Sequence, residues 1–231
     1  MNLDQLFVIS NLLAHSMTVL AFFIAIWVGI IWGRADRIVA WVGLYFFASF
    51  GANLMGTILI AMKLRDWVNV PGNLHNCIAV GVLSLIYIEA LDGRWRGILK
   101  TIGPILFVLA VLNLLFWQGK LHNSYSYMTA GAMGLILGIS YFYQLMRDLP
   151  TMAIQRLPIF WFNTSFLVYS SSTLLQFIFR DYLAEISWEI LGMFHIFHNA
   201  VSLVSMGLIL IGLYHAHIDL KRQSSRNVSI S

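Results

Sequence analysis

The sequence predicts an all-α protein, a polytopic membrane bundle of seven transmembrane helices. Of its 231 residues, 59% are hydrophobic and only 10% are charged. Soluble domains are about half apolar and about a quarter charged, so one water-soluble core could not bury this much apolar surface. The composition argues against a soluble enzyme and a disordered chain. Because Cys77 is the one cysteine in the sequence, a disulfide scaffold is excluded as well.

Seven apolar segments are long enough to cross a bilayer, whose hydrocarbon core needs about 20 helical residues. The segments are 8–32, 38–62, 72–91, 98–117, 124–146, 157–179 and 186–214. Pro104 lies in the fourth segment and is expected to start or kink that helix. We assign residues 1–217 to the seven-helix domain and residues 218–231 to a short polar cytoplasmic tail.

The Lys and Arg residues predict the orientation, because cytoplasmic loops carry an excess of them. Ten follow the odd-numbered segments and four follow the even-numbered ones: Arg34, Arg37, Arg94, Arg96, Lys100, Arg147, Arg156, Lys221, Arg222 and Arg226 against Lys63, Arg65, Lys120 and Arg180. The N-terminus is therefore expected outside and the C-terminus in the cytoplasm. We expect a multi-pass protein of a bacterial inner membrane, surrounded by lipid bilayer and without a nucleic-acid partner.

Small residues recur at every fourth position in the first, second and fifth segments. They are Ala21, Ala25, Gly29 and Gly33; Ala48, Ala52 and Gly56; and Ala130, Gly134 and Gly138. Such stripes let helices approach closely in lipid. We favour packing within one bundle, and a homodimer stays open as the alternative.

The seventh segment carries the clearest polar pattern. His195, His198, Ser202 and Ser205 share one helix face, and Asn199 lies beside them. Polar residues at membrane depth are costly and usually face the interior of a bundle. In the expected orientation many of these polar groups fall in the outer half of the membrane. The sequence therefore predicts an outward-facing pocket lined by Asn11, Asn53, Asn76, Tyr169, Ser172, Gln176 and Asn199.

The histidines leave three interpretations open. His195 and His198 are spaced to hold a metal from one helix, with His15 or His75 as a third ligand. The metal would be zinc, or the iron of a haem held axially by two histidines from different helices. Imidazoles could instead sense protons or a ligand, or belong to a hydrogen-bonded seam that specifies packing. Retinal is not expected, since the seventh segment has no lysine before Lys221.

Two stretches carry a family resemblance. Residues from Ile159 to Ser165 (Ile-Phe-Trp-Phe-Asn-Thr-Ser), continuing to Phe179, resemble a helix in the N-terminal seven-helix regions of sensor histidine kinases from Bacteroidetes. Residues from His195 to Asn199 (His-Ile-Phe-His-Asn) are similar to the next helix of that family, although His198 has no counterpart there. The resemblance implies a signal-receiving membrane module, which without a kinase domain acts through a separate cytoplasmic partner.

A looser resemblance points to the superfamily of alkaline ceramidases and adiponectin receptors. That family holds an intramembrane zinc with histidines, including a His-x-x-x-His pair in its last span. Here the pair is His195-x-x-His198, and the aspartate expected in an earlier span is not found. This resemblance implies a zinc-dependent hydrolase of lipids.

The functional hypothesis that we favour, over an enzyme, is an integral membrane sensor with an outward-facing, histidine-containing pocket. A metal-dependent lipid hydrolase is the first alternative. A small solute or ion transporter is the second, on the grounds of size and the number of spans.

Overall fold

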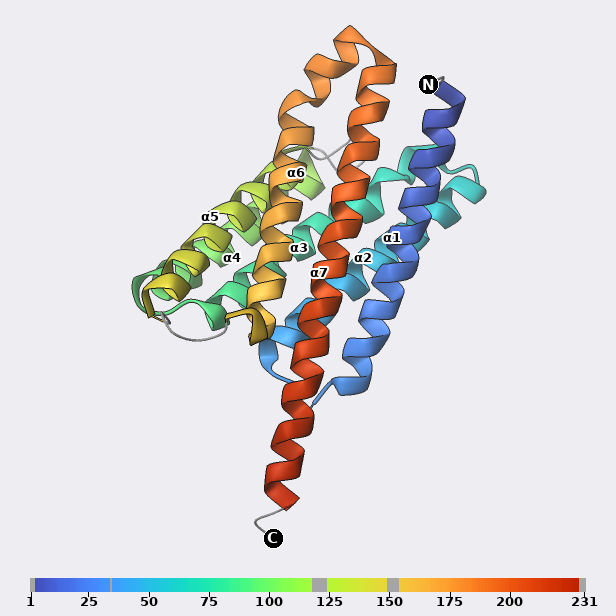
Figure 1. Cartoon of the computed structure of the whole chain (residues 1–231). Coiled ribbons are helices and arrows are strands. Elements are labelled where there is room, and N and C mark those ends of the chain that lie inside the picture. Colours follow the sequence, from blue (N-terminus) through green and yellow to red (C-terminus); the bar gives the residue numbers. More distant parts are fainter. Residues whose placement is uncertain (1–2, 34, 118–123, 149–153, 229–231) are drawn as a thin grey trace.

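The computed structural model describes residues 3–33, 35–117, 124–148 and 154–228 (Figure 1). The described residues form seven α-helices and two short 3-10 turns and contain no strand, which confirms the all-α class. The helices are α1 (Leu3–Ile31), α2 (Arg37–Ala61), α3 (Asn69–Ala90), α4 (Gly93–Phe116), α5 (Ser124–Asp148), α6 (Pro158–Ile186) and α7 (Trp188–Val228); the turns are η1 (Arg65–Trp67) and η2 (Ile154–Arg156).

Six of the helices are long and apolar enough to cross a membrane: α1, α2, α3, α4, α5 and α7. The chain is thus compatible with a multi-pass membrane protein. The sixth expected segment also forms a helix, α6, but its many hydroxyl and amide side chains keep it outside this set. Pro104 lies inside α4 and does not start it, because the helix already begins at Gly93.

The helices form one bundle in which chain neighbours pack together. The last helix returns to the first, since α7 lies between α1 and α6 (Figure 1). Helix α3 packs against α2, α4 and α5 and is the most buried of the six membrane candidates. The two ends of the chain lie at opposite ends of the bundle (Figure 1).

Helices α6 and α7 form a long hairpin separated by one residue, Ser187. Its hydroxyl oxygen accepts the backbone N–H of Glu189 at 3.1 Å, which caps the start of α7. At its other end α7 continues to Val228, so the expected boundary between bundle and tail at residue 217 falls inside a helix. The reason is local, because no proline or glycine follows Gly212 to end the helix.

The small-residue stripes differ in whether they contact a neighbouring helix. On α5, a side chain at Gly134 would overlap Ser170 of α6, so this stripe packs within the bundle as expected. On α1 and α2, Gly29 and Gly56 face open space. The close approach of α1 and α2 lies instead at Gly43, which no stripe includes. The homodimer stays a prediction.

Candidate functional site: a polar ladder and a central cavity

Polar pairs join α6 and α7 at successive turns of the hairpin. Gln176 Nε2 lies 2.8 Å from His195 Nδ1, and Ser172 Oγ lies 2.9 Å from His198 Nδ1. Deeper in the bundle, the Ser165 hydroxyl donates to the backbone carbonyl of Ser205 at 2.8 Å. The second pair lies four residues from the first on α6 and three on α7, and the third lies seven residues further along each helix, so all of these groups fall on the two facing surfaces. We call this row of three contacts the polar ladder.

The polar ladder engages both histidines that the sequence marks as metal ligands. His198 is buried with only 9% of its surface exposed, whereas His195 is exposed. An amide nitrogen can only donate, so His195 Nδ1 accepts from Gln176 and carries its proton on Nε2. In this tautomer neither ring nitrogen of His195 offers a free lone pair to a metal.

The expected third ligands do not join the ladder. His15 lies on the exposed surface of α1, as do Asn11 on the same helix and Asn53 on α2. Within residues 3–33, 35–117, 124–148 and 154–228, no three His, Cys, Asp or Glu side chains gather as a metal site would require. The geometry therefore favours the hydrogen-bonded seam among the interpretations of the histidines.

A small cavity lies at the inner part of the ladder, between α1, α2, α3, α6 and α7. Its volume is about 50 Å³, and one water molecule occupies about 30 Å³ in the liquid. Five polar and four aromatic residues line it with two methionines: Ser49, His75, Ser165, Ser202 and Ser205; Tyr45, Phe46, Phe166 and Tyr169; Met17 and Met206. We call this space the central cavity.

Aromatic rings make up much of the cavity wall. The Tyr45 ring stands nearly perpendicular to the rings of His75 and Phe166, with centroids 5.1 Å and 5.5 Å away. The hydroxyl groups of Tyr45 and Tyr169 hydrogen-bond to each other. The Tyr169 ring in turn lies 5.8 Å from the ring of His198, which connects the cavity to the ladder.

The buried polar atoms without a partner among the described residues include Nδ1 of His75, which lines the cavity, and Nδ2 of Asn199 on α7. The Asn76 side chain hydrogen-bonds to Tyr127. Asn76 and Asn199 are at least nine-tenths buried. Asn76 lines a second, smaller space of about 10 Å³, which shares the walls formed by Tyr45, Phe166 and Tyr169 with the central cavity. Unsatisfied buried polar atoms are costly, so they mark positions where a small bound molecule would be stabilising.

The structure thus gathers part of the predicted site. Tyr169 lines the central cavity, Asn76 lines the adjoining space, and Ser172 and Gln176 belong to the ladder. Asn199 is buried on α7 but lines neither space. Sequence reasoning missed Tyr45, Phe46 and Phe166, because aromatic residues in an apolar helix are typical of a core. The one available signal was the four-residue spacing of Tyr45 and Ser49, which places their two hydroxyl-bearing side chains on the same face of α2.

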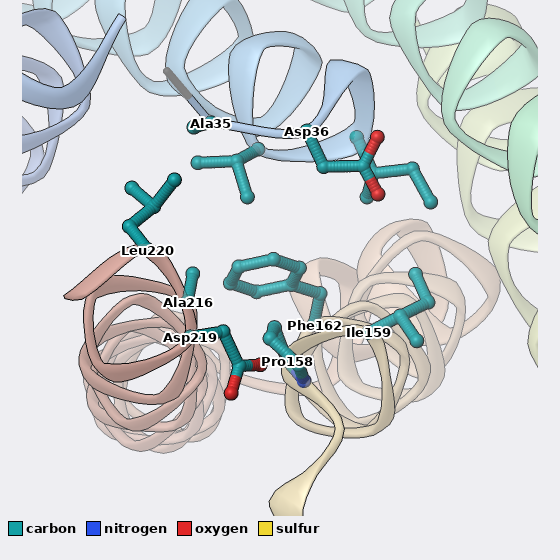
Figure 2. Close-up of a pocket in the computed structure, with 10 residues that line it drawn as sticks. Ala35, Asp36, Pro158, Ile159, Phe162, Ala216, Asp219 and Leu220 are labelled. Carbon is teal, nitrogen blue, oxygen red and sulfur yellow. The ribbon is translucent and has the colours of Figure 1, made fainter. Parts of the chain in front are cut away.

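A larger cavity of about 420 Å³ lies at the opposite end of the bundle, where the α1–α2 turn meets the start of α6 and the extended part of α7. Figure 2 shows Asp36 and Asp219 approaching it from opposite sides, with Phe162 between them. The Asp36 carboxylate accepts the backbone N–H of Arg37, and Asp219 lies 3.9 Å from Arg222. We call this space the end cavity.

No protein-family model, curated protein or solved structure matches the chain. The functional argument therefore rests on the geometry of the ladder and the two cavities.

Proposed function

We propose that the chain is a multi-pass protein of a bacterial inner membrane, with all seven helices crossing the bilayer, the N-terminus outside and the C-terminus in the cytoplasm. Two observations support this proposal. Every helix exposes large apolar side chains, as a lipid-facing surface requires: Phe23, Phe47, Leu74, Leu115, Ile136, Ile178 and Val204. The polar residues of α6, such as Asn163, Ser165 and Ser172, are buried inside the bundle, where a membrane helix tolerates them.

Within this topology, the protein acts as a sensor of a small ligand. The carrying observation is the central cavity, where five helices meet and where His75, whose Nδ1 has no partner among the described residues, forms part of the wall. A ligand that satisfies groups on several helices at once stabilises the helix arrangement in which those groups converge. The bound and free proteins would then differ in how the helices pack.

Helix α7 is the element that carries this difference to the cytoplasm. It lines the central cavity with Ser202, Ser205 and Met206 and continues to the end cavity with Ala216 and Asp219. A continuous helix transmits a tilt or rotation along its length without a hinge. The output is contact with a separate cytoplasmic partner at the end of the bundle that contains the end cavity.

The proposal is tested by measuring distances between helices in the presence of small solutes. Spin labels are placed at Arg94→Cys and Arg222→Cys, two exposed positions, in a Cys77→Ser background. A panel of solutes with at most four non-hydrogen atoms includes ammonium, formamide, urea, methanol and acetate. We expect at least one solute to shift the distance distribution.

A matched variant fills the cavity. Ser205→Leu places apolar bulk in the space, and the shift should disappear while the unliganded distance is retained. A distance distribution that no solute alters in the unfilled protein would overturn the sensor proposal. Reporter fusions at the two termini test the orientation independently, with the C-terminal fusion expected in the cytoplasm.

A further inference from the structure

Three of the four serines that line the central cavity can only accept further hydrogen bonds. Ser202 and Ser205 donate their single hydroxyl hydrogens to the carbonyl oxygens of His198 and Val201, at 2.9 Å and 3.0 Å. Ser165 donates to the carbonyl of Ser205. Each hydroxyl oxygen is left with lone pairs that accept but with no hydrogen to give. A molecule held by these three serines must therefore donate hydrogen bonds.

The aromatic wall favours positive charge. Tyr45, Phe46, Phe166 and Tyr169 line the cavity, and the Tyr45 and Phe166 rings are inclined at 78° to each other. Aromatic faces attract cations, and rings set at steep angles around one point are typical of ammonium recognition. The residues that line the cavity include no Lys or Arg that would repel a cation. They include no Asp or Glu either, so only ring faces and oxygen lone pairs are available to stabilise the charge of a bound ion. Such neutral groups disfavour a divalent ion, which needs carboxylate ligands.

The volume limits the ligand further. A space of about 50 Å³ holds a molecule of about the size of one or two waters. We propose that the central cavity binds a small ammonium ion, either NH4+ itself or methylammonium. This inference rests on the proposed sensor function and names its ligand class. The N–H groups donate to Ser165, Ser202 and Ser205, and the unpartnered Nδ1 of His75 is a further acceptor when its proton lies on Nε2.

The polar ladder supplies a path for such an ion. Gln176 and His195 form the exposed rung, and Ser172 and His198 form the buried rung that adjoins Tyr169. Successive polar side chains can replace the water molecules that an ion loses as it leaves solvent. The path then ends at Ser202, one turn of α7 beyond His198.

The test is ligand-dependent stabilisation of the full chain in detergent, measured as the thermal unfolding midpoint in chloride salts of equal ionic strength. Ammonium and methylammonium are compared with potassium, a cation of similar size without N–H groups, with tetramethylammonium, and with methanol. We expect an apparent affinity for ammonium about tenfold above that for potassium. The proposal would be overturned if potassium shifted the unfolding midpoint as much as ammonium does. A midpoint shift as large as that in ammonium, caused by tetramethylammonium or by methanol, would overturn it as well.

Two cavity variants and one control locate the site. Ser202→Ala removes an acceptor, and Phe46→Leu removes a ring face while keeping an apolar side chain. Each should weaken ammonium binding by about tenfold. Ser171→Ala is the matched control, because Ser171 makes the same kind of bond to its own helix, to Leu167 O at 2.8 Å, and does not line the cavity. Weakening in the control equal to that in Ser202→Ala would contradict the assignment.

The spin-label distance of the sensor experiment, recorded on the same samples, separates the two proposals. Specific ammonium binding with an unchanged distance supports the ligand assignment and overturns sensing. A distance that responds to another solute while ammonium gives no specific stabilisation supports sensing and overturns the ligand assignment.

Discussion

The Tyr87 hydroxyl donates a 2.6 Å hydrogen bond to Asn163 Oδ1 in the middle of the bundle. Both residues are almost fully buried, with exposed fractions of 0% and 1%. Asn163 Nδ2 in turn donates to the carbonyl oxygen of Gly138 at 3.2 Å. One amide side chain thereby connects α3, α5 and α6 in surroundings where no water competes for the bonds.

Removing the Tyr87 hydroxyl should destabilise the bundle. Tyr87→Phe leaves Asn163 Oδ1 buried without its donor, which costs about 1–3 kcal/mol of the free energy of unfolding. Reversible unfolding in mixed micelles measures this change. Tyr143→Phe is the control, because Tyr143 is 67% exposed, and its effect should stay within about 0.5 kcal/mol. Equal effects of the two substitutions would contradict a structural role for the Tyr87–Asn163 bond.

The seven helices were predictable because their cause is local. Long apolar runs separated by Gly, Pro and charged residues fix where helices form, and each expected segment corresponds to one helix. The full length of α7 was not predicted, because the apolar run defines only the expected span to residue 214, whereas the helix continues to Val228 through polar residues with no proline or glycine to end it. The contact between α1 and α2 at Gly43 could not be predicted, since several small residues on these helices were equally able to make it.

Gly43 gives a second prediction. A Cβ added there would overlap the Val28 side chain of α1, so Gly43→Ala should destabilise the protein by about 1–3 kcal/mol. Gly51 lies on the same helix with open space around it, so Gly51→Ala should be neutral or stabilising by up to about 1 kcal/mol. The double variant Gly43→Ala/Val28→Ala should recover part of the loss. Thermal unfolding of the parent, the single variants Gly43→Ala, Gly51→Ala and Val28→Ala, and the double variant measures these differences, and additive losses in the double variant would rule out the contact.

The residues of the site, like the helix ends and contacts, were predictable where their position depends on one helix and not where it depends on how helices pack together. Helical spacing correctly placed His195 and His198 on one face, because that depends on the geometry of a single helix. The same spacing could not tell that Asn11 and His15 face outward on α1. Which way a helix face points is decided by its neighbours. The aromatic wall around Tyr45 was hidden for a further reason, because its chemistry emerges only when rings from different helices meet.

The two rungs of the polar ladder should differ in their contribution to stability. Ser172→Ala leaves the buried His198 Nδ1 without its partner and should cost about 1–3 kcal/mol. Gln176→Ala exposes His195 to solvent that can replace the lost bond, so its cost should stay below about 0.5 kcal/mol. Denaturant unfolding of both variants gives the comparison. A larger loss in Gln176→Ala would mean that the buried rung is not the more important one.

The zinc content of the purified protein shows whether His195 and His198 belong to a hydrogen-bonded packing seam or to a metal site. His195 Nδ1 and His198 Nδ1 are engaged by Gln176 and Ser172, and the described residues supply no third metal-binding side chain nearby. Elemental analysis of protein prepared without chelators or a polyhistidine tag should therefore give the same zinc content for the parent and for His195→Ala/His198→Ala. Near one zinc per chain in the parent and its loss in the double variant would contradict the seam and support the hydrolase alternative. The same comparison made for iron tests haem ligation, because removing an axial histidine that α7 supplies would release the haem.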